Sequence, residues 1–355
     1  MSQTDEFSGL VNSLVDGRSS ILVYQTAFLG DVVLLTPLLR AIRAAFPRAP
    51  LGAVVIPQCR EVVEGLVDQV ILIDKRGGNG EVYSQAIEKI KAFAPDVAFI
   101  PHRSIRSGRL LKLAGIPVRI GFDKGGGSYW HTKKVHYQEG LYEGERNLAL
   151  LSPLTLQKSS SLPTLNISPQ SEQNVMLLMD KLALCEREFV VIAPASVWKT
   201  KTWSSSHYRD LGEQLLINFG LKTVAVGGKE DFAVCESSVV TADLNLAGQL
   251  SPLESAGLMS KSRLVVSGDS AAAHLATGVG AKQVIIFGST APRYGFLPSS
   301  VNVRAVGLDL WCRPCSDHGR RKCPLHIEPE CLEQITHKMV LSMISDWVAP
   351  NIESS

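Results

Sequence analysis

Residues able to do chemistry stand directly after apolar, strand-like runs of this sequence. Asp31 follows the run 21–24, and Lys201 lies in a polar stretch after another such run. Within 263–288, an apolar run is followed by turn formers around Asp269, a helix of small residues and a second apolar run. A helix that begins directly after a parallel strand directs unpaired N–H groups and its positive dipole end at a ligand. The sequence therefore predicts an anion site here, most often for a phosphate.

The candidate ligand-binding residues share this position after a strand. They are Ser196, Lys201, Glu230, Asp269, Ser270 and His274. A lysine in such a turn meets a phosphate as a point charge. Glu230 follows two glycines, where the backbone can approach a ligand closely and a carboxylate can accept hydrogen bonds from ribose hydroxyls. Asp31, at the start of another helix, is a candidate general base.

Several of these residues also have a structural interpretation. Asp31 can stabilise the N-terminus of its helix as a carboxylate beside the dipole. The stretch 194–203 can be a solvated loop in which Trp203 staples the following helix. His274 can be a packed side chain whose ring is satisfied within the core. The sequence by itself leaves these alternatives open.

Four of the seven cysteines fall close together near the end of the chain. They are Cys312, Cys315, Cys323 and Cys331. The Cys-x-x-Cys pair has the ligand chemistry of a tetrahedral zinc site, but the other spacings are irregular. Packing and redox roles are the alternatives to a metal. We therefore predict no metal site and no cofactor.

Length, charge and apolar runs bound the class of protein. The 355 residues predict roughly two domains of ~100 to 200 residues each. With 36 basic and 34 acidic residues, no global field attracts nucleic acid. No apolar run reaches the ~18 residues of a membrane span, and the polar start lacks the layout of a signal peptide. We expect a cytoplasmic protein that does not bind nucleic acid.

Strand-like and helical patterns alternate along the chain, which is typical of doubly wound α/β sheets. Strands are expected at 21–24, 51–56, 69–73, 96–100, 118–121, 189–193, 221–226, 245–248, 264–266 and 284–287. Helical patterns cover 58–66, 81–93, 104–114, 145–156, 171–184, 206–219 and 329–347, with Ser171 as one of the caps. We expect a loosely docked N-terminal extension at 1–19 and two domains at 20–160 and 161–328. The last segment, 329–355, is expected to form a helix that packs back on the N-terminal domain.

Five segments, in this order, carry a resemblance to a known family. They are TAFLGDVVLLTPLLRAI, RSGRLLKLAGIPVRIGF, KTKTW, GGKED and SGDSAAAHLATGVGAKQVIIFGST. Together they resemble glycosyltransferase family nine, the ADP-heptose:lipopolysaccharide heptosyltransferases, over residues 20–335. The cysteine-rich segment favours the heptosyltransferase II-like subgroup. The sequence departs from the family at Ala271 and Ala272, where a glycine is usual, and at 26–28, where smaller polar residues are common.

The resemblance implies a GT-B architecture, in which two Rossmann-like domains face each other across a cleft. The N-terminal domain would bind the acceptor and the C-terminal domain the nucleotide sugar. Asp31 would be the base, and the donor would be bound by Ser196, Lys201, Glu230, Asp269, Ser270 and His274. An anionic acceptor would be bound by Arg103, Arg106, Arg109 and Lys124, for which an exposed helix face is the structural alternative.

The implied activity is inverting, metal-independent transfer of heptose from ADP-heptose to an inner-core lipopolysaccharide acceptor. The basic residues would also permit peripheral contact with the cytoplasmic face of an anionic inner membrane. The alternatives are a GT-B transferase with another nucleotide sugar and a non-catalytic nucleotide-sugar-binding protein. A nicotinamide oxidoreductase is disfavoured because no dinucleotide fingerprint is present.

Overall fold

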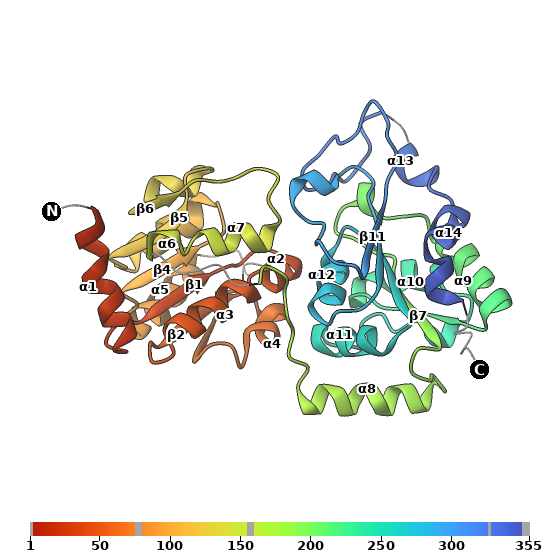
Figure 1. The fold of residues 1–355 in the computed structure, drawn as a ribbon, viewed down its shortest axis with the longest axis horizontal. Helices are drawn as coiled ribbons and strands as arrows, with labels where there is room; N and C mark the ends of the chain where they lie inside the picture. Colours follow the sequence, from red (N-terminus) through yellow and green to blue (C-terminus); the bar gives the residue numbers. More distant parts are fainter. Residues whose placement is uncertain (1–2, 75–79, 155–159, 326–327, 350–355) are drawn as a thin grey trace. The chain divides into compact units, whose positions relative to one another are not determined.

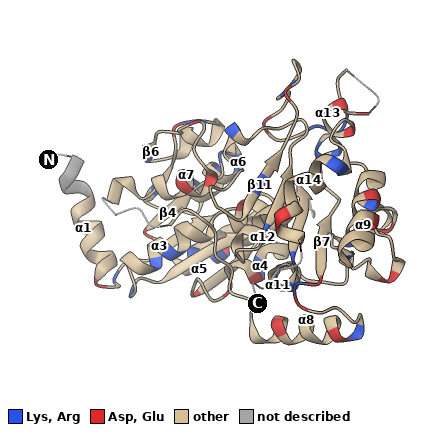
Figure 2. Ribbon diagram, turned by 45° about the vertical axis from the view of Figure 1, so that its right-hand side comes forward, with Lys and Arg blue, Asp and Glu red and all other residues tan. Residues whose placement is uncertain are grey.

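The computed structural model describes residues 3–74, 80–154, 160–325 and 328–349. The chain divides into two compact units, Met1–Pro163 and Thr164–Ser355. Each unit contains one parallel sheet with helices packed on it (Figure 1), which is the α/β class that the sequence predicts. Figure 2 shows acidic and basic residues interspersed along the ribbon of each unit, in keeping with the balanced charge.

The N-terminal sheet has six parallel strands in the order β3-β2-β1-β4-β5-β6. They are β1 (Ile21–Tyr24), β2 (Leu51–Val55), β3 (Gln69–Leu72), β4 (Val97–Ile100), β5 (Val118–Phe122) and β6 (Lys133–Val135). The sequence predicts all except β6, whose two lysines hide the strand pattern. β1 and β4 are buried along their whole length, as expected for a parallel sheet covered on both faces. The strand order reverses between β1 and β4, and ligands bind at the carboxyl ends of strands at such a reversal.

Helices of the N-terminal unit follow the predicted alternation. They are α1 (Gln3–Val15), α2 (Leu29–Val33), α3 (Thr36–Ala45), α4 (Arg60–Val63), α5 (Gly80–Phe93), α6 (Ile105–Leu113) and α7 (Glu143–Ala149). Pro37 lies in the first turn of α3, where a missing N–H costs no hydrogen bond. The helical stretch after β1 is therefore divided into two helices, α2 and α3. The N-terminal extension forms α1, and Leu14 anchors it with no exposed surface.

The C-terminal sheet has five parallel strands in the order β11-β10-β9-β7-β8. They are β7 (Phe189–Ala193), β8 (Lys222–Ala225), β9 (Leu264–Gly268), β10 (Gln283–Ile286) and β11 (Val303–Val306). The strand expected at 245–248 is reduced to one isolated bridge between Asn245 and Ala225, and β11 is additional. The order reverses between β7 and β9, so the loops after these two strands begin at a ligand-binding position.

Helices of the C-terminal unit are α8 (Pro169–Lys181), α9 (Ser205–Phe219), α10 (Phe232–Ser238), α11 (Pro252–Lys261), α12 (Ala271–Gly278), α13 (Glu330–Glu333) and α14 (His337–Val348). Ser168, not the predicted Ser171, caps α8, because its hydroxyl accepts the Ser171 N–H at 3.1 Å and Pro169 fits the first helical position. Gly220 ends α9 in the left-handed conformation, directly after the last residue of the predicted helical pattern 206–219.

The C-terminal helical pattern divides into α13 and α14, and α14 packs within the C-terminal unit. Val340 and Ile344 of α14 share a core cluster with Trp203 and with Leu211 of α9. Trp203 has no exposed surface, and its Nε1 donates to Ile335 O at 2.7 Å. The return of this segment to the N-terminal domain stays a prediction.

The chain that enters the C-terminal unit is fastened to the end of α12. Leu165 N donates to Gly278 O at 2.8 Å. The Leu165 side chain lies so close to Gly278 that a Cβ atom there would sit 2.7 Å from Leu165 Cγ. The second residue of this unit is thus bound to the carboxyl end of this short helix.

Candidate functional site

The loop after β7 lies on the carboxyl ends of β9 and β10. Two glycines permit this approach: a Cβ atom on Gly268 would lie 2.5 Å from Lys201 O, and one on Gly288 would lie 2.6 Å from Thr200 O. Ser289 N donates to Thr200 O at 3.1 Å, and the hydroxyls of Thr200 and Ser289 lie 2.9 Å apart. The loop is therefore held on the sheet by its own backbone rather than free in solvent.

Lys201 and Asp269 form a buried ion pair at this edge of the sheet. Lys201 Nζ lies 2.9 Å from Asp269 Oδ2, and the side chains are 12% and 3% exposed. Thr290 Oγ1 donates to the same carboxylate oxygen at 2.8 Å. Because water is excluded, each charge strongly stabilises the other, and loss of one would leave its partner uncompensated. An ammonium group has three N–H donors, so Lys201 can hold Asp269 and a ligand oxygen together.

Two buried polar atoms next to the ion pair lack a hydrogen-bond partner among the described residues. They are Ser270 Oγ and His274 Nδ1, which are shielded from solvent. Buried polar atoms are nearly always paired in native proteins, so such atoms mark a place that a ligand or water completes. Ser270 occupies the N-cap position of α12, yet its side chain makes no cap hydrogen bond. Ala273 N donates to Ser270 O at 3.2 Å, so the N–H groups of α12 that precede Ala273 are the ones available to an anion.

The His274 ring is neutral at physiological pH. His274 is 5% exposed. Burial lowers its pKa to about 4; the Asp269 carboxylate opposes this decrease and the Lys201 ammonium adds to it. A neutral imidazole serves a hydroxyl or a phosphate oxygen as donor or acceptor without bringing another charge to the ion pair.

The low pKa of His274 predicts a loss of stability in acid. The unfolded chain takes up this proton below its usual 6.5, whereas the folded protein resists protonation down to about 4. The contribution to the free energy of unfolding, about 3 kcal/mol, is complete above pH 6.5 and disappears as the pH falls towards 4. Urea unfolding should therefore show a shallower loss of stability between about pH 7 and pH 4.5 in His274→Gln than in the unchanged protein.

A second histidine variant serves as the control, because it separates the effect of His274 protonation on stability from the effect of carboxylate titration. His318 is an exposed histidine whose Nε2 lies 3.6 Å from Asp317 Oδ2. His318→Gln should keep the pH dependence of the unchanged protein, because an exposed pair contributes little to stability. Identical pH profiles for His274→Gln and the unchanged protein would show that burial does not hold His274 neutral.

Ser196 and Glu230 stand at the ends of the neighbouring strands β7 and β8. Ser196 Oγ accepts the Trp198 N–H at 3.3 Å. Glu230 is exposed in a short 3-10 turn, whereas its neighbour Asp231 accepts the Gly228 N–H at 2.8 Å and fixes the turn. The C-terminal sheet thus presents both residues at the edge that carries Lys201 and Asp269.

Arg313 also fixes this edge, although no sequence pattern distinguishes it. Its guanidinium donates to the backbone carbonyls of Phe287, Gly288, Thr290 and Leu308. A planar guanidinium has five donors in a fixed geometry and can hold these four carbonyls at once, whereas an ammonium group has only three donors. Arg313 thereby fixes Thr290, whose hydroxyl holds Asp269. A role of Thr290 at the site could have been predicted from the sequence, because Thr290 follows the strand expected at 284–287.

Asp31 lies at the carboxyl end of β1, in the first turn of α2 and beside the reversal of the N-terminal sheet. Its Oδ2 accepts the Phe28 N–H at 3.1 Å, which is the helix-terminus contact of the structural interpretation. Burial, with a smaller effect of the Asp31 charge, raises the pKa of the Cys59 thiol to about 12. The helix contact leaves a role as base open, because a carboxylate has two oxygens and several acceptor sites.

The four basic residues of the predicted acceptor site divide into two pairs. Arg103 and Lys124 meet at the ring of Tyr137, with Arg103 Cζ 4.6 Å and Lys124 Nζ 5.1 Å from the ring centroid. Arg106 and Arg109 are exposed on α6, so the helix-face interpretation also holds for them. The structure therefore groups Arg103 with Lys124 at one aromatic ring.

The four C-terminal cysteines line one small pocket. They are Cys312, Cys315, Cys323 and Cys331, and all four thiols are free. Burial raises the pKa of Cys331 to about 11. Among the described residues, no three of these sulfur atoms lie within 4.8 Å of one another, so they do not stand at the spacing of a tetrahedral metal site.

No helix within the described ranges combines the length and apolar character that crossing a bilayer requires. Solved structures share the two-sheet architecture. A glycosyl transferase family 9 protein from Veillonella parvula superposes with a TM-score of 0.80 at 18% identity, over 93% of this chain and 97% of that chain. The Escherichia coli ADP-heptose lipopolysaccharide heptosyltransferase II gives 0.74 at 21% identity, over 93% and 98%. The fold is therefore the GT-B fold of glycosyltransferases.

The sequence comparison gives the family. The family model described as "Glycosyltransferase family 9 (heptosyltransferase)" matches residues 85–326, more than half of the chain. Lipopolysaccharide heptosyltransferase 2 of Salmonella typhimurium is 24% identical over 307 residues, which cover 81% of this chain and 88% of the relative. The chain belongs to glycosyltransferase family 9 and is a glycosyltransferase.

Proposed function

We propose that this enzyme transfers heptose from ADP-heptose to an inner-core lipopolysaccharide acceptor, with inversion and with no metal at the reacting centre. The observation that carries the proposal is the buried pair Lys201–Asp269 beside the uncapped N-terminus of α12. A fixed cation and free N–H groups together form an anion site that suits a pyrophosphate. The ADP-heptose enzyme of E. coli has the same fold, which supports the choice of donor.

Each donor-site residue has a role in this proposal. Lys201 and the N–H groups of α12 bind the pyrophosphate and stabilise the negative charge that grows on it. Ser270 Oγ and His274 Nδ1 complete their hydrogen bonds on the pyrophosphate or the heptose hydroxyls. Glu230 accepts hydrogen bonds from the ribose, and Ser196 donates to a phosphate oxygen. Asp269 holds Lys201 in place.

The chemical step is a single displacement. The acceptor oxygen forms a bond to the anomeric carbon while the bond from that carbon to the pyrophosphate oxygen breaks. The electron pair of the broken bond leaves with ADP, and the acceptor proton passes to Asp31. Attack from the face opposite the leaving group inverts the configuration. Because ADP is a good leaving group stabilised by Lys201 and α12, the step needs one base and fixed positive potential.

The acceptor is proposed to bind the N-terminal unit through its basic residues. Arg103, Arg106, Arg109 and Lys124 suit the phosphates and carboxylates of an inner core. The exposed side chains of Ile105 and Tyr129, on and beside the basic helix α6, suit peripheral contact with an anionic membrane. Sedimentation with anionic vesicles but not with neutral ones is the expected result.

A donor panel tests the proposed function. ADP-heptose should raise the melting temperature, and UDP- and GDP-sugars should leave it unchanged, since only a ligand of the folded state stabilises it. Transfer to a heptose-bearing core acceptor should then yield ADP and the extended core. Stabilisation by another nucleotide sugar would identify a transferase with a different donor. Binding of ADP-heptose with no product would favour the non-catalytic alternative.

A further inference from the structure

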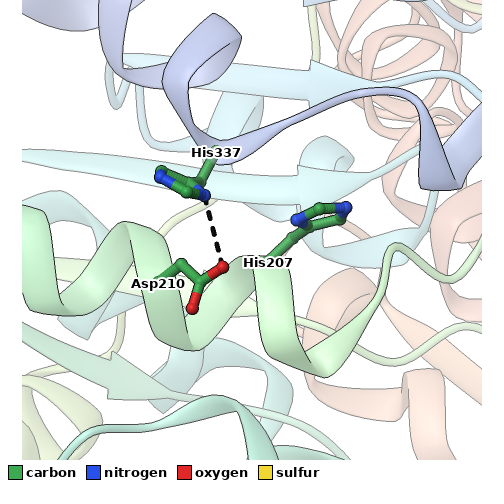
Figure 3. A group of neighbouring side chains, drawn as sticks. All are labelled: His207, Asp210 and His337. Atoms are coloured by element: carbon green, nitrogen blue, oxygen red, sulfur yellow. Dashed lines mark ion pairs between the residues drawn. The ribbon is translucent and has the colours of Figure 1, made fainter.

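Three side chains outside the proposed donor site bring together the ligand types of a metal centre. His207 and Asp210 lie on α9, and His337 begins α14 (Figure 3). One ring nitrogen or carboxylate oxygen from each lies within 4.8 Å of those of the other two. His337 Nδ1 is 3.3 Å from Asp210 Oδ2. His207 and Asp210 are three residues apart on one helix, so their side chains share a face.

The hydrogen bond of His207 selects its tautomer. His207 Nε2 lies 3.0 Å from Glu333 O. A carbonyl oxygen only accepts, so Nε2 carries the hydrogen and Nδ1 of the neutral ring holds a lone pair. That Nδ1 is shielded from solvent and has no hydrogen-bond partner within the described part of the chain. Metal-binding histidines characteristically donate their second N–H to a carbonyl or carboxylate, which orients the other nitrogen to the ion.

The His207 ring and the chain around His337 are anchored in this arrangement. The ring stacks on Trp203 with centroids 5.3 Å apart and an interplanar angle of 23°. Trp203 Nε1 donates to Ile335 O at 2.7 Å, between Glu333 and His337 in the chain. An ion at this place would therefore meet a His207 ring that is already positioned, which reduces the entropy lost on binding.

We propose that His207, Asp210 and His337 bind one divalent transition-metal ion of the zinc type. Two imidazoles and one carboxylate are ligands that Zn²⁺ accepts, with water as the fourth. Zinc–nitrogen bonds of about 2.0–2.1 Å place tetrahedral ligand atoms about 3.4 Å apart, so the group closes by at most about 1.4 Å. Asp210 and His337 are 46% and 20% exposed, which gives them room to move. The ion ties α14 to α9.

An ion pair between His337 and Asp210 alone explains less of the observed geometry than a bound metal ion does. A contact between His337 and Asp210 explains their 3.3 Å separation, but it leaves the shielded lone pair of His207 without a partner. A metal ion satisfies all three ligand atoms at once. The free cysteines lining the pocket at 312–331 are a competing source of zinc affinity, so the experiment must separate nitrogen and oxygen ligands from sulfur.

Metal titration of the full chain tests the proposal. After treatment with a chelator, the protein is loaded with Zn²⁺ or Co²⁺ alone and its bound metal is counted. We expect one ion at this site, with a cobalt spectrum that lacks a thiolate charge-transfer band. His207→Gln and His337→Gln should each weaken binding at least about tenfold. Zn²⁺ should raise the melting temperature of the unchanged protein and have little effect on the two variants.

Matched variants keep the outcome decisive. His136→Gln removes an exposed histidine that pairs with Asp123 but has no third ligand group near it in the described ranges, and this variant should bind metal as the unchanged protein does. Asp210→Asn, at a partly exposed position, provides a milder third variant if either histidine variant fails to fold. Metal uptake that survives in the His207, His337 and Asp210 variants, or that Cys312→Ser alone abolishes, would overturn the proposal.

Discussion

Asp31→Asn is expected to lower kcat of heptose transfer by about 10³-fold, within the range of 10² to 10⁴ for loss of a general base. Asparagine keeps an oxygen that can accept the Phe28 N–H, so α2 retains its terminal contact. It cannot take a proton from the acceptor hydroxyl. The melting temperature and the KM for ADP-heptose should therefore stay close to those of the unchanged enzyme. Steady-state kinetics with saturating acceptor measure the effect.

The control is a carboxylate of the same unit with a purely structural contact. Asp68 precedes β3, at the opposite edge of the sheet, where its Oδ2 accepts the Leu51 N–H at 2.8 Å and pairs with Arg43 at 2.7 Å. Asp68→Asn should lower the melting temperature and keep kcat. If Asp31→Asn retained more than about a tenth of kcat, Asp31 would be a helix-terminal residue and not the base.

Lys201→Met is expected to lower kcat/KM for ADP-heptose by about 10² to 10³, the scale of losing one preorganised charge contact. It should also destabilise the fold by about 3 kcal/mol, because Asp269 stays buried without its cation. The double variant Lys201→Met/Asp269→Asn removes both charges. Its stability should largely recover while its activity stays low. Urea unfolding and transfer kinetics on the same samples separate the two effects.

Lys199 supplies the comparison within the same turn. It is 63% exposed and lies 3.6 Å from Glu328, so Lys199→Met should change neither stability nor kcat/KM substantially. Recovery of transfer together with stability in the double variant would contradict a role of Lys201 on the donor phosphates. Lys201 would then act only as the partner of Asp269.

Most strands and the residues that follow them could be predicted from the sequence. An apolar run and the polar residues after it are neighbours in the chain, so both are visible in a short stretch of sequence. Asp31, Lys201 and Asp269 each follow a strand, and parallel sheets bind ligands at those ends. Helix caps were harder to predict than strands. Ser168 and Ser171 are both suitable N-cap residues for α8, and Pro169 selects Ser168 because proline is favoured at the first helical position. β6 was missed because two lysines occupy it.

Contacts between distant residues could not be predicted from the sequence. The strand order depends on which strands pair with each other in the sheet. Because the apolar runs that form the strands have similar sequences, the sequence does not show which of them pair. Thr290 and Arg313 support Asp269 through hydrogen bonds that span the sheet edge. His207 and Asp210 show helical spacing in the sequence, but nothing there connects them with His337, which meets them only because α14 packs on α9.

The tie between Leu165 and Gly278 bears on how this unit can be exchanged between relatives. Leu165 N bonds to Gly278 O, and its side chain fills the space that a Cβ on Gly278 would need. A chimaeric enzyme joined before Thr164 takes both Leu165 and α12 from one parent. A junction between 166 and 277 takes the two from different parents, and a larger residue opposite leucine would clash. The second junction should therefore lower the melting temperature of the chimaera wherever the other parent has a residue larger than glycine at position 278.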